Sequence, residues 1–257
     1  MNRFRVLLAG SAIETERHRR ALASLPNHFE IVESERADIY LHSQSDGIGE
    51  YPNNSALVLD EPTRMFEPIF EHVRVLPAFQ YLPLIQEIPT IKAGSTFSLT
   101  NIEITCLNAH TSESSIASCL FEILAIIRVL TGKAADVDAH TKIENGLLIA
   151  GHVADESTSF AISIFRSPLN FGEINILGVS KSERVSIAIQ SDQTAQPGKI
   201  RLFDKTGSSQ SWPLHQNSHR LTWLAAYKLA AKNSSSKLYN EIDLEADCSA
   251  AKMVPLG

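Results

Sequence analysis

The start of the chain places the strongest constraint on its fold. Residues 5–9 read Arg-Val-Leu-Leu-Ala and are followed by Gly10, which is the pattern of a buried strand that runs into a tight turn. Residues 14–25 then carry apolar side chains at helical spacing. A buried strand, a glycine turn and a helix in this order predict the first unit of a parallel α/β sheet.

The next strands are too closely spaced for a complete dinucleotide-binding domain. Three extended segments follow, at residues 29–33, 37–42 and 56–59. Only three residues separate the first two, whereas a parallel crossover between neighbouring strands needs roughly a dozen or more, so these two cannot be consecutive parallel neighbours. Residues 44–54 are rich in turn formers, and a helix is expected over residues 63–72. We therefore expect a truncated, Rossmann-like domain over residues 1–76.

A different pattern begins at residue 77. Residues 97–107 alternate apolar and polar side chains, and a long capped helix that ends at Gly132 follows them. Five strands without an intervening helix are then expected, at residues 142–149, 157–165, 172–179, 184–190 and 200–203. Helices at residues 221–231 and 241–253 end the chain. This order predicts an α/β domain with an open, mostly antiparallel sheet over residues 77–257.

Composition excludes several classes of protein. Lys plus Arg number 23 against 29 Asp plus Glu, with no long run of either sign, so no surface for nucleic acid is expected. The longest apolar run, at residues 123–127, is far shorter than the roughly 20 residues that span a bilayer. The first residues lack the pattern of a secretory signal, and we expect a cytoplasmic protein. Cys106, Cys119 and Cys248 lack paired spacing and are expected to be reduced packing residues.

The order of these segments resembles one known family. Residues 55–62, Ser-Ala-Leu-Val-Leu-Asp-Glu-Pro, are similar to a family strand that ends in Glu-Lys-Pro. Residues 117–132 lie where the family has its long helix, and residues 185–202 resemble its final hairpin. The sequence thus resembles the glucose-fructose oxidoreductase and inositol dehydrogenase (Gfo/Idh/MocA) family. The resemblance implies a Rossmann domain, an α/β domain with an open sheet, and NAD(P)-dependent oxidoreductase activity.

The family pattern also implies that the cofactor turn is incomplete. Its glycines would fall on Gly10, Ala12 and Thr15, and only the first is present. A methyl group at Ala12 narrows the approach of the backbone to a pyrophosphate. The remaining candidates for binding a cofactor are Gly10, Ser11 and Ala12.

The family's proton-transfer residues are replaced. Its lysine falls on Glu61, and its helical Asp-x-x-x-His pair falls on Ser118 and Glu122. Glu61 and Glu122 could form a carboxylate pair for acid–base catalysis if their elements meet in a cleft; the alternative is a loop-capping Glu61 and a solvated Glu122. His110, just before the long helix, is a candidate base or a surface histidine.

One histidine pair has the spacing of a metal site. His215 and His219 are four residues apart, as two ligands on one helix face would be. Asn217, however, looks like a helix cap between them, so that only one of the two would lie on the helix. No metal is expected.

Two functional classes follow from these residues. The first is a binding or scaffolding subunit that lacks standard dinucleotide-dependent catalysis, acting alone or with an active partner enzyme. The second is an NAD(P)-dependent oxidoreductase with a remodelled site that acts on a small polar or carbohydrate-like substrate. In either class we expect a homodimer through the open sheet, or assembly with a related enzyme subunit. Ile164 and Ile176 are the expected contact residues.

Overall fold

The chain forms two compact units in a computed structural model. It describes residues 3–10, 12–33, 37–43, 51–53, 55–108, 113–167, 172–190, 198–207, 209–231 and 241–254. The first unit comprises Met1–Pro83 and Asn217–Asn240, and the second comprises Leu84–Gln216 and Glu241–Gly257. A single boundary after residue 76 was expected from the sequence. In the structure, Asn217–Asn240 also belongs to the first unit.

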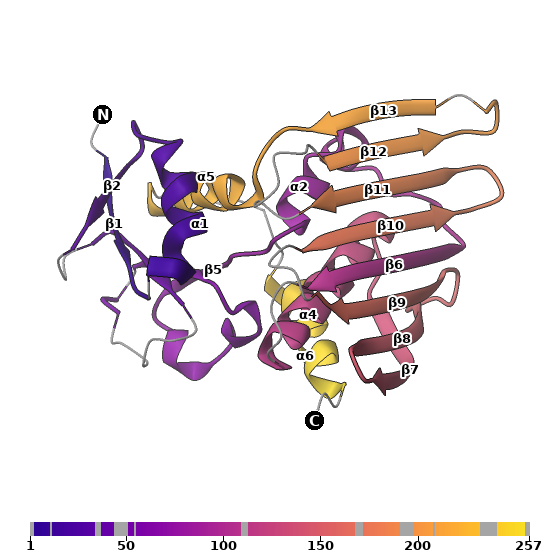
Figure 1. Cartoon of the computed structure of the whole chain (residues 1–257), viewed down its shortest axis with the longest axis horizontal. Coiled ribbons are helices and arrows are strands. Elements are labelled where there is room, and N and C mark those ends of the chain that lie inside the picture. The colour runs from indigo at the N-terminus through magenta and orange to yellow at the C-terminus, as the bar shows by residue number, and fades with distance from the viewer. Residues whose placement is uncertain are drawn as a thin grey trace. The chain divides into compact units, whose positions relative to one another are not determined.

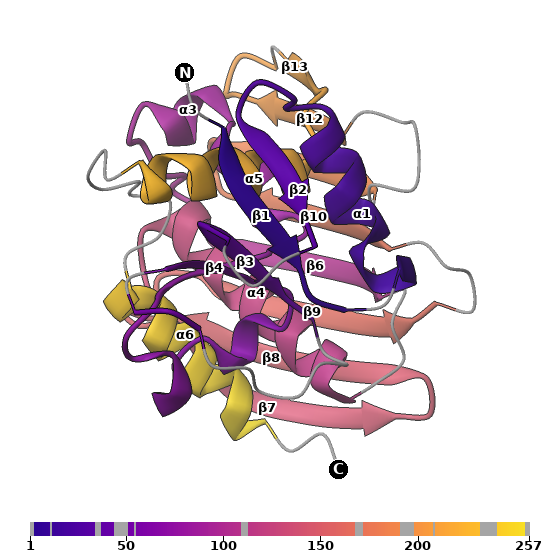
Figure 2. The same cartoon turned by 90° about the vertical axis from the view of Figure 1, so that its left-hand side faces the viewer.

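The first unit contains a five-stranded parallel sheet in the order β2-β1-β3-β4-β5. Figure 2 shows β2, β1, β3 and β4 of this sheet. Its strands are β1 (Phe4–Leu8), β2 (Phe29–Val32), β3 (Ile39–His42), β4 (Ala56–Leu59) and β5 (Arg74–Pro77). Strands β3 and β4 are buried at every position, as expected of short apolar strands covered on both faces. The predicted Rossmann-like architecture is confirmed.

Strands β2 and β3 are not neighbours, as predicted, because they pair with opposite edges of β1. Val32 at the end of β2 pairs with Leu7, and Ile39 at the start of β3 pairs with Val6. The two ends therefore lie at nearly the same level of the sheet. The register explains why six residues suffice for this connection.

Two helices far apart in sequence cover one face of this sheet. Helix α1 (Ala12–Ala23) packs on α5 (Ser218–Ala230), and α5 contacts β4 and β5 (Figure 1). Their buried apolar side chains form one core with the sheet, including Val6, Leu22, Leu25, Phe29, Ile39, Val58 and Trp223. The first unit therefore requires α5, which lies more than a hundred residues after β5.

The helix predicted over residues 63–72 is wrong. The structure has two short 3-10 helices there, η1 (Pro62–Arg64) and η2 (Pro68–Phe70). Pro68 has no N–H to donate and disfavours a helical conformation of the residue before it, and Glu67 is extended, with ψ 141°. The proline therefore divides the segment.

The second unit contains an eight-stranded sheet in the order β13-β12-β11-β10-β6-β9-β8-β7. All neighbouring strands are antiparallel except β6 and β9, so the predicted open, mostly antiparallel sheet is confirmed (Figure 1). Its strands are β6 (Asn101–Asn108), β7 (Ala135–Ile143), β8 (Gly146–Val153), β9 (Ser159–Arg166), β10 (Glu173–Val179), β11 (Arg184–Gln190), β12 (Gly198–Phe203) and β13 (Ser209–Leu214). The strand predicted at residues 142–149 is only partly correct, because this segment contains the end of β7, the turn of the β7–β8 hairpin and the start of β8.

Helices α4 (Glu113–Thr131) and α6 (Glu241–Met253) pack together in the second unit. Two short helices, α2 (Leu82–Gln86) and α3 (Pro89–Lys92), precede β6 in the chain. Gly132 ends α4 with φ +76°, as predicted for its cap. The Arg128 guanidinium donates hydrogen bonds of 2.9 and 2.8 Å to the two carboxylate oxygens of Asp247 and so joins α4 to α6. No helix among the described residues is long and apolar enough to cross a membrane.

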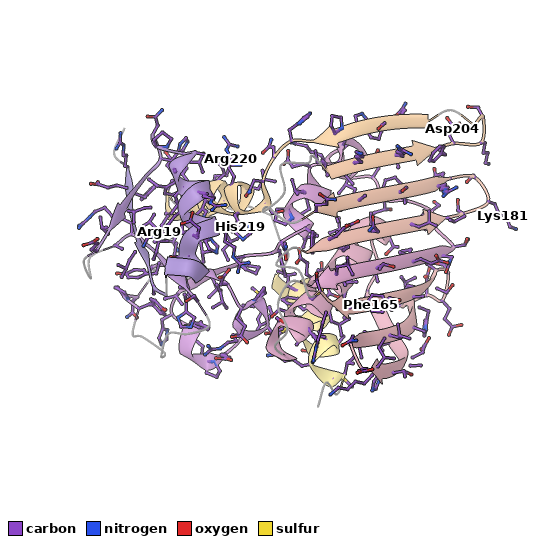
Figure 3. All side chains as sticks on the ribbon, in the orientation of Figure 1. Arg19, Phe165, Lys181, Asp204, His219 and Arg220 are labelled. Carbon is purple, nitrogen blue, oxygen red and sulfur yellow. The ribbon has the colours of Figure 1, made fainter. Side chains whose placement is uncertain are left out.

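The two faces of the eight-stranded sheet differ. Ile164 and Ile176 are 0% and 2% exposed and belong to the core, so the expectation that they face a partner is wrong. Side chains alternate along each strand, and the residues that face outward are the intervening ones. These are small, polar or partly exposed apolar residues, among them Glu103, Thr105, Leu148, Ala161, Phe165, Asn175, Leu177 and Ala188; Figure 3 labels Phe165.

This arrangement predicts effects of very different size for similar truncations on adjacent strands. Ile164→Ala should lower the free energy of unfolding by about 2–5 kcal/mol, because it leaves a cavity in the core. Leu148→Ala, on the outward face of β8, should change it by only about 0.5 kcal/mol. Urea denaturation of both variants measures the difference. Equal losses would contradict the assignment of the two faces.

Candidate functional site

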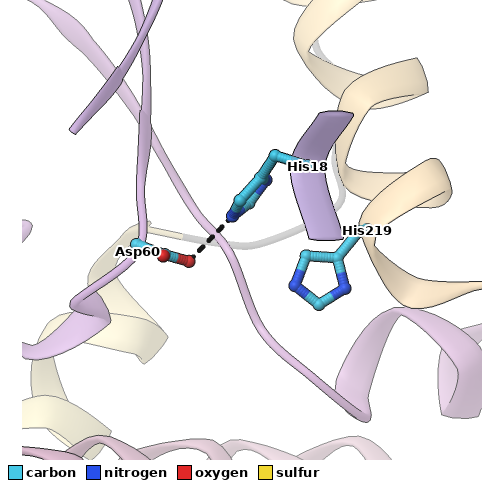
Figure 4. A group of neighbouring side chains, drawn as sticks. All are labelled: His18, Asp60 and His219. Atoms are coloured by element: carbon cyan, nitrogen blue, oxygen red, sulfur yellow. Dashed lines mark hydrogen bonds and ion pairs between the residues drawn. The ribbon is translucent and has the colours of Figure 1, made fainter. Parts of the chain in front are cut away.

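A buried charged network lies at the carboxyl end of β4. Asp60 directly follows the strand, and its Oδ2 accepts a hydrogen bond of 2.9 Å from Arg17 Nη2. Its Oδ1 lies 2.9 Å from Nε2 of His18, the next residue of α1 (Figure 4). The His18 side chain is 0% exposed and the Asp60 side chain is 6% exposed. Open α/β sheets bind their ligands at the carboxyl ends of the strands, so this network is a candidate functional site.

Trp223 on α5 fixes the proton of His18. Its Nε1 lies 3.2 Å from Nδ1 of His18, and an indole nitrogen can only donate. Nδ1 of His18 must therefore accept, which leaves the proton of the neutral ring on Nε2, where it is donated to Asp60. Every polar atom of His18 is satisfied by protein.

Burial determines the charges of the network. Desolvation lowers the pKa of His18 to about 4, although the Asp60 carboxylate opposes this shift. Burial alone would raise the pKa of Asp60, but Arg17 and His18 together hold it well below its usual value. At neutral pH the network therefore contains a neutral imidazole and an Asp60–Arg17 ion pair.

His219 is the third member of a group with metal-ligand chemistry. The ligand-type atoms of His18, Asp60 and His219 lie within 4.8 Å of one another, and the two histidine rings meet edge to face at 4.8 Å between centroids (Figure 4). A metal on His18 Nε2 would displace its proton, and Nδ1 could not take that proton because the Trp223 N–H points at it. The Asp60 carboxylate is also already paired with the positive charge of the Arg17 guanidinium. The arrangement suits a hydrogen-bonded network better than a cation.

The predicted cap between His215 and His219 is confirmed. Asn217 precedes α5, and its side chain accepts a hydrogen bond from the backbone N–H of Arg220. His219 and Arg220 lie in the first turn of the helix (Figure 3), whereas His215 is exposed before it. The two histidines do not form the i, i+4 pair of a helical metal site.

The turn after β1 is filled by protein side chains. Gly10 has φ +128°, a conformation that other residues rarely adopt. A Cβ atom at this position would lie 2.1 Å from Ser43 Oγ and 3.4 Å from Thr15 Cγ2. Ser43 and Thr15 are both buried. Gly10 is therefore required by the packing of this turn against the end of β3.

Thr15 stands where the third glycine of a dinucleotide-binding turn would be. That glycine lets the helix pack closely on the strand, and here a buried threonine fills the same place. The described residues of this turn do not fit the standard binding of a pyrophosphate. Ser11 lies outside the described residues, as does the side chain of Ala12, the first residue of α1.

Glu61 and Glu122 have protein partners in separate units. One carboxylate oxygen of Glu61 lies 3.9 Å from Arg64 Nη1, and Arg64 also binds Glu67. Glu122 lies on α4 and is buried, not solvated. Their pairing stays a prediction, since the units are described individually. His110 lies outside the described residues.

A second polar pair lies at the end of β3. The Tyr51 hydroxyl is 2.6 Å from Nδ1 of buried His42, and the rings of both residues contact Phe70. Neither this pair nor the Asp60 network was predicted from the sequence. Asp60 carried a usable signal, because it follows a buried strand, but its partners Arg17 and His18 lie on α1 and the Trp223 that binds His18 lies on α5.

The fold is shared with proteins of known activity. No family model matches the sequence, and no curated protein sequence matches it. UDP-N-acetylglucosamine 3-dehydrogenase GnnA from Acidithiobacillus ferrooxidans is 8% identical, with a TM-score of 0.63 over 99% of this chain and 97% of that one. KijD10 from Actinomadura kijaniata, a 3-ketoreductase in complex with TDP-benzene and NADP, is 8% identical, with a TM-score of 0.61 over 98% of each chain.

A regulator has the same fold. The transcriptional regulator Gal80p from Kluyveromyces lactis is 11% identical, with a TM-score of 0.57 over 89% of this chain and 84% of that one. The structural neighbours include Gfo/Idh/MocA-type oxidoreductases as well as this regulator, and the likeness establishes the fold. The comparison with GnnA spans nearly the full length of both chains and so does not confirm the expected truncation.

The network predicts a loss of stability in acid that depends on His18. The unfolded chain takes up a proton on this residue below pH 6.5, whereas the folded chain takes it up only near pH 4. The free energy of unfolding should therefore fall by about 3 kcal/mol as the pH decreases across this interval. His18→Gln should remove most of this fall, and His140→Gln, at an exposed histidine, should not. Urea denaturation at several pH values, followed by tryptophan fluorescence, measures the free energy of unfolding. If His18→Gln shows the same dependence of this free energy on pH as the wild type, the assignment of the acid sensitivity to His18 is refuted.

Proposed function

We propose that this protein is a binding or scaffolding subunit with a Gfo/Idh/MocA-like fold that lacks standard dinucleotide-dependent catalysis. The observation that carries this proposal is the filled turn after β1. Ser43 and Thr15 are buried against Gly10, and Thr15 stands where the family pattern has its third glycine, which lets the helix pack closely on the strand. A cofactor that docked there would have to displace packed side chains, which costs free energy.

The charge at Glu61 supports the same proposal. By the family resemblance, this residue stands where the lysine would supply a positive charge and a proton. A carboxylate that faces Arg64 supplies neither. The transcriptional regulator Gal80p is a precedent for a regulatory role on this fold, although fold alone does not establish function.

The alternative is an NAD(P)-dependent oxidoreductase with a remodelled site. Its support is that KijD10 carries NADP on the same fold, and that the buried Ser43 hydroxyl has no hydrogen-bond partner among the described residues. A buried hydroxyl of this kind can indicate a ligand. On this alternative Gly10, Ser11 and Ala12 would contact the cofactor. Glu61, Glu122 and His110 would then be the acid–base candidates for a small polar or carbohydrate-like substrate.

Titration with NADPH and NADH separates the two classes. Isothermal calorimetry of the purified full-length protein should show no saturable binding up to millimolar cofactor, because Ser43 and Thr15 occupy the turn. KijD10 under the same conditions is the positive control. Saturable binding at micromolar concentration would refute the proposal and favour the oxidoreductase.

We also propose a homodimer through the outward face of the eight-stranded sheet. Small side chains lie on this face: Ala150 of β8 pairs with Ala161 of β9, and Ala188 of β11 pairs with Asn175 of β10. Small side chains leave room for a second sheet to approach. An interface of standard size would cover several strands. A related enzyme subunit is the alternative partner for the same face.

Substitution at the centre of this face tests the dimer. Ala161→Arg introduces a long charged side chain on the outward face of β9 and should convert a dimer to a monomer while the circular dichroism spectrum stays unchanged. Analytical ultracentrifugation measures the mass. The matched control is Lys142→Arg, which keeps the charge of the edge strand β7. A dimer that survives Ala161→Arg would place the interface elsewhere.

A further inference from the structure

Two of the three cysteine side chains meet between β6 and α4. The Sγ atoms of Cys106 and Cys119 lie 3.2 Å apart, within hydrogen-bond distance for two thiols. Cys106 is on a central strand of the eight-stranded sheet and Cys119 is in the first half of the helix. Cys106 and Cys119 were expected to be packing residues, because nothing in their spacing along the chain indicates that they meet.

The two thiols differ in their access to solvent. Cys106 is fully buried, whereas Cys119 is less completely buried as a residue, although its thiol is buried as well. Cys119 is therefore the nearer of the two residues to solvent, and a small oxidant has the shorter path to it. Cys106 is then placed to attack the oxidised sulfur from within the protein, as a resolving cysteine does.

We propose that Cys106 and Cys119 form a reversible disulfide within one chain on reaction with a hydroperoxide. With hydrogen peroxide as the oxidant, the Cys119 thiol loses its proton and the thiolate attacks one peroxide oxygen. The O–O bond breaks, Cys119 becomes a sulfenic acid, and the departing hydroxide takes up the proton from the thiol and leaves as water. The Cys106 sulfur then attacks the Cys119 sulfur, the S–O bond breaks, and a second water leaves with the Cys106 proton. The two thiols supply the two electrons that reduce hydrogen peroxide to two molecules of water.

The resting pair is protected from indiscriminate oxidation. The hydrogen bond with Cys106, burial and the nearby Glu122 carboxylate raise the pKa of Cys119 well above its usual value. Because the thiolate is the reacting species, the first step is slow and the second, within the preformed pair, is fast. The product links α4 to β6 and does not depend on whether the chain binds a dinucleotide.

Peptide mapping tests the proposal on the full chain. The protein is treated with hydrogen peroxide, its free thiols are alkylated, and it is digested without reductant for mass spectrometry. The free thiols should fall from three to one per chain. The Cys106 and Cys119 peptides should appear linked, lighter by two hydrogen atoms and separable by dithiothreitol, while Cys248 remains alkylated.

Single substitutions provide the controls. Cys248→Ser should form the same link, because Cys248 is buried on α6 and takes no part. Cys106→Ser should leave Cys119 as a sulfenic acid that dimedone traps. The proposal is overturned if the wild-type chain keeps three free thiols, passes directly to a sulfinic acid, or forms links only through Cys248 or between chains. The peptide map of the oxidised wild-type protein tests the proposal even if a variant does not fold.

Discussion

The first unit depends on the buried Asp60 carboxylate and the two α1 side chains that compensate for its charge. Asp60 directly follows β4, Arg17 and His18 come from α1, and Trp223 of α5 fixes the tautomer of His18. An uncompensated charge in such a site would cost several kcal/mol, so the three elements must assemble together. The network explains why α5, so late in the chain, belongs to the first unit.

The same network limits the chemistry available at this edge of the sheet. A histidine held neutral, with both nitrogens engaged, is neither a free base nor a ready metal ligand. Beside it, Ser43 and Thr15 close the turn at Gly10. Polar residues gather where the fold usually binds ligands, but most of their hydrogen-bonding capacity is directed at one another.

Much of the fold could be predicted from local patterns. The parallel and antiparallel sheets, the cap at Gly132 and the cap at Asn217 follow from periodicity and cap chemistry, which depend on neighbouring residues. The helix expected at residues 63–72 was wrong because Pro68 interrupts the segment. The contact residues Ile164 and Ile176 were wrong because alternation identifies two faces without saying which one the helices cover.

The sequence by itself determined which segments are strands or helices, where prolines and glycines interrupt them, and that the glycine pattern of a dinucleotide turn is incomplete. Only the tertiary structure decided that His18 meets Asp60 and Trp223, that Cys106 meets Cys119, and that residues 217–240 join the first unit. The physical reason is distance along the chain. Local propensity acts over a few residues, whereas charge compensation, tautomer choice and thiol contact arise between side chains that only packing brings together.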